Sequence, residues 1–350
     1  MKWKWLLLIS ITILGIGYTS SSGNPVNNKK EVVCFIYHRF GDSRYPTTNV
    51  SVEDFEAHLR YLLENDFQIL TFSQAVAYLK SEQTSRKTAV ITIDDGYKSF
   101  LVNALPLLER YNIPATLFIN TKTVGGGDYM KWEELKDVVR HNIEIGNHTH
   151  SHEYFLNLPA SSRYKTFKEE IELSQSIIKK NLDLQPIVFS YPYGEFDVEM
   201  KGIVKQAGFV AAAAQNSGVM VSGSDIFQCP RFPMSETYSS RRQFAEKASM
   251  HALQLVDQSP ESFLLGETNP PTLTVKLGRS DLNLKEVQCF VQGGECQVEV
   301  LETGDNGITL SLRALKPLAA RRRTLYTLTV RDKHGHWYWF SHLWINPAIR

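Results

Sequence analysis

Two adjacent carboxylates are the residues of this chain whose types and position first suggest catalysis. Asp94 and Asp95 follow an apolar, β-branched run, TAVITI at 88–93, and precede Gly96. Neighbouring side chains of a strand normally point to opposite sides, but where the strand ends in a turn both can reach one pocket. One carboxylate could then bind a cation while the other moves a proton. The alternative is a helix cap with a solvated partner.

Three histidines lie within the short segment NHTHSH at 147–152. His148 and His152 are four positions apart, a common metal-ligand spacing, although here they follow a strand-like run. Two neutral imidazoles and one carboxylate would make a three-ligand zinc site that leaves one position for water, whose pKa falls toward about 7. A histidine-rich loop without metal is the alternative. The strand-end position that this segment shares with the two aspartates favours the metal site.

Alternating strand and helix patterns between residues 32 and 232 predict how these groups are positioned. The expected strands are 32–37, 67–70, 88–93, 115–119, 143–146, 186–191, 209–213 and 227–232. One helix is expected after Ser51, and a second begins at Ser73. The other expected helices cover 98–110, 131–140, 161–181 and 197–206. Such apolar strands imply an α/β fold with a parallel sheet covered on both faces, either a (β/α) barrel or a doubly wound sheet.

Folds of both kinds place their sites at the carboxyl ends of the strands. The polar residues that fall there are Asp94, Asp95, His148, His152, Pro192, Tyr193 and Arg231. Their common position favours a functional interpretation of all of them.

The composition changes after about residue 260, where prolines and polar residues are typical of a linker. The strands predicted beyond it are 273–277, 287–292, 296–301, 308–315, 324–331 and 336–345, with no helix among them. We expect a small β-sandwich of the immunoglobulin-like kind that binds glycan or a partner and holds no catalytic residue. The four aromatic side chains at 337–340 alternate between the two faces of the strand, so they form two pairs. One pair is expected in the core, and the other is expected to be exposed as a surface that binds sugar.

The first residues predict export. Two lysines, an apolar run from Leu6 to about Ile16 and small polar residues up to Gly23 have the layout of a secretory signal peptide. An uncleaved membrane anchor is the alternative, because no A-x-A cleavage site follows. We therefore expect a signal peptide or anchor at 1–25, a first domain at 32–258 and a second at 265–350.

Charge and cysteine content add two expectations. The net charge of +1 gives no indication of a nucleic-acid or acidic partner, and the RRR segment at 321–323 is expected to be a solvated face or turn. Cysteines of an exported chain can form disulfides. If Gln292 and Glu295 border a two-residue turn, Cys289 faces Val298 and not Cys296, so a direct bridge would need a shifted register or a bulge. A bridge between Cys34 and Cys229 is expected if the first and last barrel strands are neighbours.

Three motifs together resemble those of the polysaccharide deacetylases, the NodB-homology group also called carbohydrate esterase family 4. TIDDG at 92–96 resembles that family's TFDDG motif, HTHSH at 148–152 its His-Ser/Thr-x-x-His motif, and SYPYG at 190–194 its Arg-x-Pro-Tyr motif. The resemblance covers about residues 32–235, and FIYHRF at 35–40 is similar to the branch that includes poly-N-acetylglucosamine deacetylases of bacterial biofilms. It implies a distorted (β/α) barrel, one divalent metal, usually zinc, and hydrolysis of N-acetyl groups from N-acetylglucosamine polymers.

The resemblance also implies roles for the first two motifs. Asp94 is the implied general base, and Asp95, His148 and His152 are the implied metal ligands. His150 occupies a variable position and is not expected to bind the metal.

The third motif departs from the family pattern. The backbone N–H of Tyr193 is expected to donate to the oxyanion, and Pro192 to shape its turn. Ser190 stands where the family has an arginine that orients the base. Arg231 is the candidate replacement and is counted with Pro192 and His38 as lining the substrate site; the alternatives are a structural salt bridge for Arg231 and a structural hydrogen bond for His38.

No clear Leu-x-His motif supplies a general acid, and His251 is expected as a surface or packing residue in a helix-like stretch. The leading hypothesis is an exported, metal-dependent N-deacetylase of an amino-sugar polysaccharide, located in the periplasm, on the cell surface or outside the cell. A carbohydrate-binding protein on an inactivated deacetylase scaffold is the alternative, and a hydrolase of acetyl esters is a third hypothesis. The sequence does not choose among poly-N-acetylglucosamine, chitin-like oligomers and peptidoglycan.

Overall fold

The computed structural model describes residues 29–279, 281–304, 307–318 and 321–349. The predicted signal peptide or anchor at 1–25 lies outside these residues. Within the described ranges, no helix has the length and apolar character that crossing a membrane requires.

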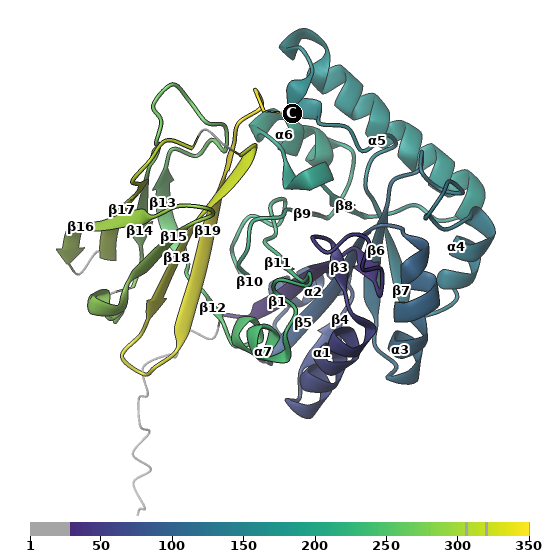
Figure 1. Cartoon of the computed structure of the whole chain (residues 1–350), viewed down its shortest axis with the longest axis horizontal. Helices are drawn as coiled ribbons and strands as arrows, with labels where there is room; N and C mark the ends of the chain where they lie inside the picture. The colour runs from purple at the N-terminus through teal and green to yellow at the C-terminus, as the bar shows by residue number, and fades with distance from the viewer. Residues whose placement is uncertain (1–28, 280, 305–306, 319–320, 350) are drawn as a thin grey trace, which may run out of the picture.

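A curled nine-stranded sheet forms the centre of the N-terminal part of the molecule (Figure 1). Seven strands run in the order β10-β1-β5-β6-β7-β8-β9, while β11 pairs with β1 and β4 pairs with β5. The pairings in this sheet are parallel except that between β1 and β10. The strands are β1 (Glu31–Tyr37), β4 (Gln68–Leu70), β5 (Thr88–Asp95), β6 (Ala115–Ile119), β7 (Ile143–Asn147), β8 (Val188–Ser190), β9 (Ala211–Ala213), β10 (Val219–Val221) and β11 (Phe232–Pro233). The expected α/β fold is confirmed, and the curled sheet with its helices fits the distorted barrel.

Helices cover the sheet, and their capping residues explain where they begin. The helices are α1 (Val52–Glu64), α2 (Phe72–Lys80), α3 (Leu105–Arg110), α4 (Trp132–Val138), α5 (Ala160–Leu182), α6 (Val198–Gln206) and α7 (Arg241–Ala248). The Ser51 side chain accepts the Asp54 N–H at the start of α1, as expected. Thr71 forms a capping box with Gln74, so α2 begins one residue before the predicted Ser73.

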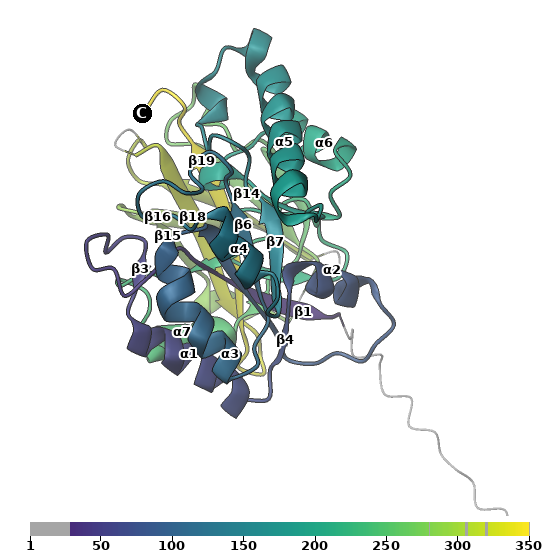
Figure 2. The same cartoon turned by 90° about the vertical axis from the view of Figure 1, so that its right-hand side faces the viewer.

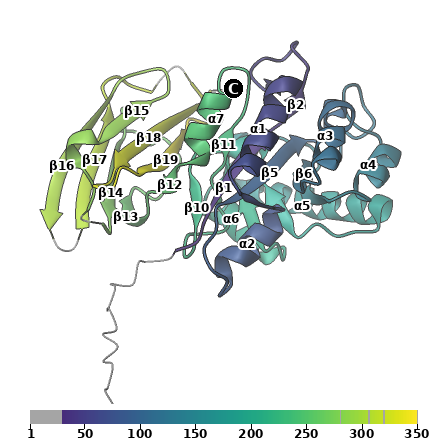
Figure 3. The ribbon, with the colours of Figure 1, turned by 90° about the horizontal axis from the view of Figure 1, so that it is seen from below.

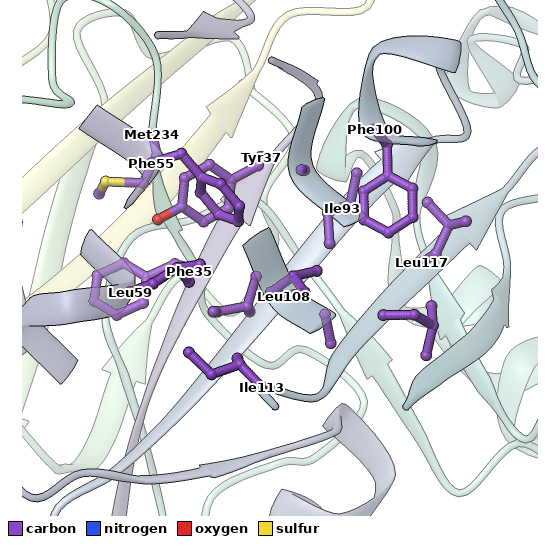
Figure 4. Close-up of a cluster of buried hydrophobic side chains, with 14 of the residues drawn as sticks. Phe35, Tyr37, Phe55, Leu59, Ile93, Phe100, Leu108, Ile113, Leu117 and Met234 are labelled. Carbon is purple, nitrogen blue, oxygen red and sulfur yellow. The ribbon is translucent and has the colours of Figure 1, made fainter. Parts of the chain in front are cut away.

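The core between helix α1 and the sheet is aromatic and aliphatic (Figure 4). Phe55 and Leu59 of α1 are fully buried together with Phe35 and Tyr37 of β1. Burying one such side chain contributes about 1.5–3 kcal/mol relative to leaving it exposed. Strand β1 is paired in parallel with β5, which carries the two aspartates, so this core lies beneath the strand that positions them.

The structure also differs from the sequence interpretation within this part. The stretch predicted as one helix at 98–110 begins with a π-helical turn, Phe100–Ala104, before α3. Strand β10 was not predicted. The strand expected at 227–232 is reduced to β11, because Cys229 makes only an isolated bridge to Ala213.

Two four-stranded sheets make up the C-terminal part, beside the α/β part (Figures 2 and 3). One sheet has the order β12-β19-β18-β15 and the other β13-β14-β17-β16. Their strands are β12 (His251–Ala252), β13 (Leu255–Ser259), β14 (Thr272–Leu277), β15 (Gln288–Val291), β16 (Cys296–Gly304), β17 (Gly307–Ala314), β18 (Arg323–Arg331) and β19 (Trp337–Ile345). Leu273 and Val275 of one sheet share a hydrophobic cluster with Tyr326 and Leu328 of the other. The all-β character is confirmed, apart from the 3-10 turn Leu284–Glu286.

Two details of this part were predicted differently. His251 lies in strand β12, which pairs with β19, and not in a helix, since α7 ends at Ala248. In the aromatic run, Tyr338 and Phe340 pack in the C-terminal core, as expected for one pair. Trp339 of the other pair stacks edge-on against Phe232, at a ring distance of 5.4 Å, and therefore packs against the α/β part.

The disulfide in the structure is not the expected Cys34–Cys229 bridge. Cys289 and Cys296 form a disulfide, with their Cα atoms 5.5 Å apart. The turn between them is shifted by one residue from Gly293-Gly294: Val291 bridges to Gly294, and this register places Cys289 opposite Cys296, so the shifted register that a direct bridge was expected to need is present. The expected Cys34–Cys229 bridge is absent from the described structure: both are free and buried, and the Cys229 thiol donates to the Ile226 carbonyl of its own loop.

Candidate metal and catalytic site

The carboxyl ends of β5, β7 and β8 bring the predicted motifs together. Strand β5 continues through both aspartates, so its ladder holds Asp94 opposite Phe118. Asp95 then adopts a φ of 75° and Gly96 a φ of 79°, which turns the chain directly after Asp94. This left-handed turn lets two consecutive carboxylates face one site, which a continuing strand would prevent.

Asp95, His148 and His152 converge on one point. Each offers a ligand atom, and these three atoms lie within 4.8 Å of one another. Asp95 Oδ1 is 3.6 Å from His148 Nε2 and 3.5 Å from His152 Nε2, and the two Nε2 atoms are 3.1 Å apart. The groups are thus arranged as a set that could hold a metal ion.

Hydrogen bonding and burial give the histidines the form that a metal requires. His148 Nδ1 lies 2.7 Å from the Ser190 carbonyl oxygen, which can only accept, so Nδ1 carries the proton and Nε2 presents its lone pair to the site. Burial lowers the pKa of His148 and of His152 to about 4, which keeps both imidazoles neutral near pH 7. The residues present therefore fit a divalent cation, and zinc among them.

Asp94 lies beside this set but is held by different partners. Its carboxylate is fully buried and receives both arms of Arg231, Nη1 to Oδ1 and Nη2 to Oδ2, each at 2.8 Å. The Ser190 hydroxyl donates to Oδ2 at 3.1 Å. Burial alone would raise the pKa of Asp94, but the Arg231 guanidinium, and after it His148, hold that pKa well below its usual range. Asp94 is therefore a fixed carboxylate at neutral pH.

The structure brings together the two interpretations left open for Arg231. It forms a buried salt bridge, and the partner is the proposed base itself. A fully buried guanidinium leaves no surface to offer to a polymer. Arg231 Nη2 also donates to the Ser190 hydroxyl at 3.0 Å, so that hydroxyl bonds both the arginine and the base.

The third motif forms a tight turn, Pro192–Gly194, beside the histidines. Tyr193 has a φ of 58°, and its ring lies 4.4 Å from that of His152 and stacks on Tyr154 at 3.7 Å. Gly194 has a φ of 71°, and a Cβ there would come within 2.5 Å of the Gln215 side chain, so only glycine fits. Pro192 is buried in the turn.

The remaining histidines differ in how close they lie to the candidate site. His38 follows β1, close enough for its charge to act on the pKa of Asp94 and His152. His150 turns away to Thr121, with 2.8 Å between Nδ1 and the hydroxyl oxygen. His251 bonds Glu31 in the contact between β1 and the C-terminal sheets.

Sequence reasoning missed two kinds of residue at this site. Asn120 follows β6 and donates to Asp95 Oδ1 at 3.4 Å, and the strand-end rule applied to β6 would have found it. Arg322 and Arg323, from the C-terminal part, reach Glu195 and Tyr193 beside the turn, and the RRR segment is therefore not wholly solvated. No local pattern at 321–323 indicates that contact.

Comparison with known proteins agrees with this geometry. Residues 81–212 match the family described as polysaccharide deacetylase, and this match, together with the relatives below, supports a hydrolytic deacetylase of that family. A putative polysaccharide deacetylase of Bacillus subtilis is 26% identical over 201 residues, which are 57% of this chain and 70% of that protein. A poly-beta-1,6-N-acetyl-D-glucosamine N-deacetylase of Staphylococcus aureus is 26% identical over 215 residues, 58% of this chain and 73% of that protein.

Solved structures give the same result for the α/β part. IcaB from Ammonifex degensii superposes with a TM-score of 0.57 at 26% identity, covering 63% of this chain and 97% of IcaB. The Streptococcus pyogenes deacetylase PplD, solved with acetate, has a TM-score of 0.57 at 16% identity and covers 63% and 99%. At that identity the second likeness supports the fold alone.

Proposed function

We propose that this protein removes N-acetyl groups from an N-acetylglucosamine-containing polysaccharide by metal-dependent hydrolysis. The observation that carries the proposal is the pairing of a buried, arginine-held Asp94 with the converging Asp95, His148 and His152. The S. aureus relative, whose name specifies poly-β-1,6-N-acetylglucosamine, supports that polymer as the first substrate to test.

The proposed metal ligands are Asp95, His148 and His152, and the proposed ion is zinc. Bound there, the ion would supply a water of lowered pKa and would polarise the acetyl carbonyl. Asn120 holds the Asp95 carboxylate, and the Ser190 carbonyl holds the His148 ring, so both ligands are oriented before the ion binds.

Asp94 is the proposed general base. Arg231 and Ser190 fix both of its oxygens, and His148 Nε2 lies 3.8 Å from Oδ2. The family's arginine is missing at 190, yet Arg231, which directly precedes β11 and does not follow a strand as predicted, supplies a guanidinium to the base. This arrangement weakens the main reason for regarding the chain as an inactive binding protein.

The turn at 192–194 is the proposed oxyanion site. Pro192 shapes it, the Tyr193 backbone N–H would donate to the developing oxyanion, and such a donor typically contributes 10²–10³-fold in kcat, on the order of 3–4 kcal/mol. His38 is proposed to line the substrate side of the site, because it is the remaining imidazole whose charge acts on Asp94 and His152.

The rest of the organisation is proposed on the sequence pattern. The segment 1–25 would be a signal peptide or membrane anchor, so the protein would act outside the cytoplasm, where such polymers are found. Residues 32–258 would be the deacetylase domain and 265–350 an immunoglobulin-like sandwich, to whose sheets the preceding strands β12 and β13 also pair. The two C-terminal sheets with one shared cluster support the last assignment.

Acetate release from a panel of substrates tests the proposal. The panel holds β-1,6-linked and β-1,4-linked N-acetylglucosamine oligomers, a peptidoglycan fragment and an O-acetylated oligosaccharide. We expect zinc-dependent release from an N-acetylated polymer. Release from the O-acetylated substrate alone would make the protein an esterase, and binding without release would favour the inactive scaffold.

A further inference from the structure

Two arginines of the C-terminal part contact the turn that carries Tyr193. Arg323, the first residue of β18, donates from Nη1 to the Tyr193 carbonyl oxygen at 2.5 Å and approaches the Gln215 side-chain oxygen at 3.4 Å. Arg322 makes a two-armed ion pair with Glu195, at 2.7 Å from Nε and 2.6 Å from Nη2. Tyr193 and Glu195 flank Gly194, so the two arginines together hold the turn on both sides of that glycine.

The Arg322–Glu195 pair is buried and well anchored. The side chains are 8% and 3% exposed, respectively. Arg322 Nη1 also donates to Asn157 Oδ1 at 2.8 Å and to the Ile349 carbonyl at 2.6 Å. Its guanidinium lies over the ring of Tyr154, 4.2 Å from the centroid, and Tyr154 in turn stacks on Tyr193. A rigid chain of contacts thus runs from β18 to the proposed oxyanion site.

The turn needs such support because Tyr193 has an unfavourable backbone conformation. A non-glycine residue with φ of 58° is strained and persists only where its surroundings determine it. The Tyr193 carbonyl belongs to the peptide after its Cα, so the bond from Arg323 anchors the turn directly next to the Cα whose N–H is the proposed donor. Oxyanion donors act through such preorganisation.

From these contacts we propose that Arg323 is a positioning residue for the deacetylase reaction, and that the C-terminal part completes the active site by fixing the oxyanion turn. The proposal rests on the proposed function and goes beyond it, since it gives the C-terminal sheets a role in turnover. It replaces the expectation that this region contributes only glycan or partner binding.

The RRR segment supplies its own matched control. Arg321 is exposed, whereas Arg323 is half-buried against the turn. The full chain is compared as wild type, Arg321→Ala, Arg323→Ala and Arg323→Lys, with kcat and KM for acetate release, zinc content, thermal unfolding and hydrogen–deuterium exchange of the peptide covering 191–196.

We expect Arg323→Ala to lower kcat by about 10–100-fold, the size of effect that misplacing a catalytic group produces. KM and zinc content should stay close to wild type, and exchange at 191–196 should rise. Arg323→Lys should recover part of kcat, because its ammonium can still donate to the Tyr193 carbonyl but lacks the planar fork. Arg321→Ala should match the wild type in every readout.

Equal kcat and equal exchange in Arg323→Ala and Arg321→Ala would overturn the proposal. A loss of kcat accompanied by lost zinc or by general unfolding would also overturn it, because that result would indicate a purely structural role. If the wild type released no acetate from any substrate, the proposed function would fail instead. Exchange at 191–196 would then decide alone whether Arg323 holds the turn.

Discussion

The two parts of this molecule contribute to one site in different ways. The curled sheet supplies the groups proposed to react. They lie in short sequence motifs at strand ends, with Asp94 and Asp95 at the end of β5 and His148 directly after β7. The C-terminal sheets supply Arg322 and Arg323, which lie 127 and 130 positions from the residues they hold. Reacting groups are thus local in sequence, and the groups that hold the oxyanion turn are not.

The largest expected effect is on zinc binding and acetate release, and it comes from a residue of the curled sheet's site. His148→Ala should abolish both zinc binding and acetate release, because it removes one of three converging ligand atoms. His150→Ala is the matched control, since His150 turns to Thr121 and should leave zinc content unchanged. Zinc measured per protein molecule checks both variants; full zinc occupancy in folded His148→Ala would remove the ligand assignment.

The second largest expected effect is on the free energy of unfolding, and it comes from a residue of the C-terminal part. Arg322→Ala removes the two-armed partner of the buried Glu195 carboxylate and leaves Arg323 Nε 3.9 Å away, which should lower the free energy of unfolding by about 3–5 kcal/mol. Arg321→Ala, at an exposed position, should stay within about 0.5 kcal/mol of wild type. Chemical denaturation of the variants measures both.

A double change sharpens this prediction. Arg322→Met combined with Glu195→Leu removes both charges and should recover much of the lost stability, because two apolar groups leave no unpaired charge. Stability of the double variant no better than that of Arg322→Ala would show that the additional bonds from Arg322 to Asn157 and Ile349, and not the ion pair, hold this contact.

The smallest effect concerns pH and the contact between the two parts. The hydrogen bond to Glu31 raises the pKa of His251 above 6.5, although burial opposes the charge, and Asp332 and Arg279 act on it from the C-terminal side. A raised folded-state pKa stabilises below the unfolded pKa, and this contribution is lost as pH rises through the folded value. Unfolding temperature should therefore fall slightly more in wild type than in His251→Gln as pH rises above 6.5; parallel curves would contradict it.

The same contrast between the two parts explains what could be predicted from the sequence. The parallel sheet and the convergence of Asp95, His148 and His152 follow from apolar strands and strand-end positions. The Cys289–Cys296 bridge was not predicted, because the two glycines indicated a turn at 293–294, whereas the chain turns one residue earlier and brings Cys289 opposite Cys296. Nor was the burial of Arg322, because three consecutive arginines are usually solvated and only the docking of β18 against Glu195 desolvates one of them.

Asp94 combines a feature that the sequence predicts with one that it does not predict. Its place beside Asp95 is evident in the motif, and the left-handed φ of Asp95 lets both carboxylates face the site. Its partner Arg231 lies 137 positions away in the sequence. From the sequence, that arginine could be either the replacement for the missing arginine or part of a structural salt bridge. Tertiary contacts between charged groups depend on the fold being complete, so a pattern of neighbouring residues does not predict them.

The division of labour between the two adjacent aspartates is the central claim, and zinc content measured together with acetate release tests it most directly. Asp94→Asn should keep zinc and lose about 10²–10⁴-fold in kcat, because an amide cannot accept the proton of the water. Asp95→Asn should instead lose zinc, with partial recovery in excess metal. Near-normal turnover in folded Asp94→Asn, or full zinc occupancy in Asp95→Asn, would contradict the account.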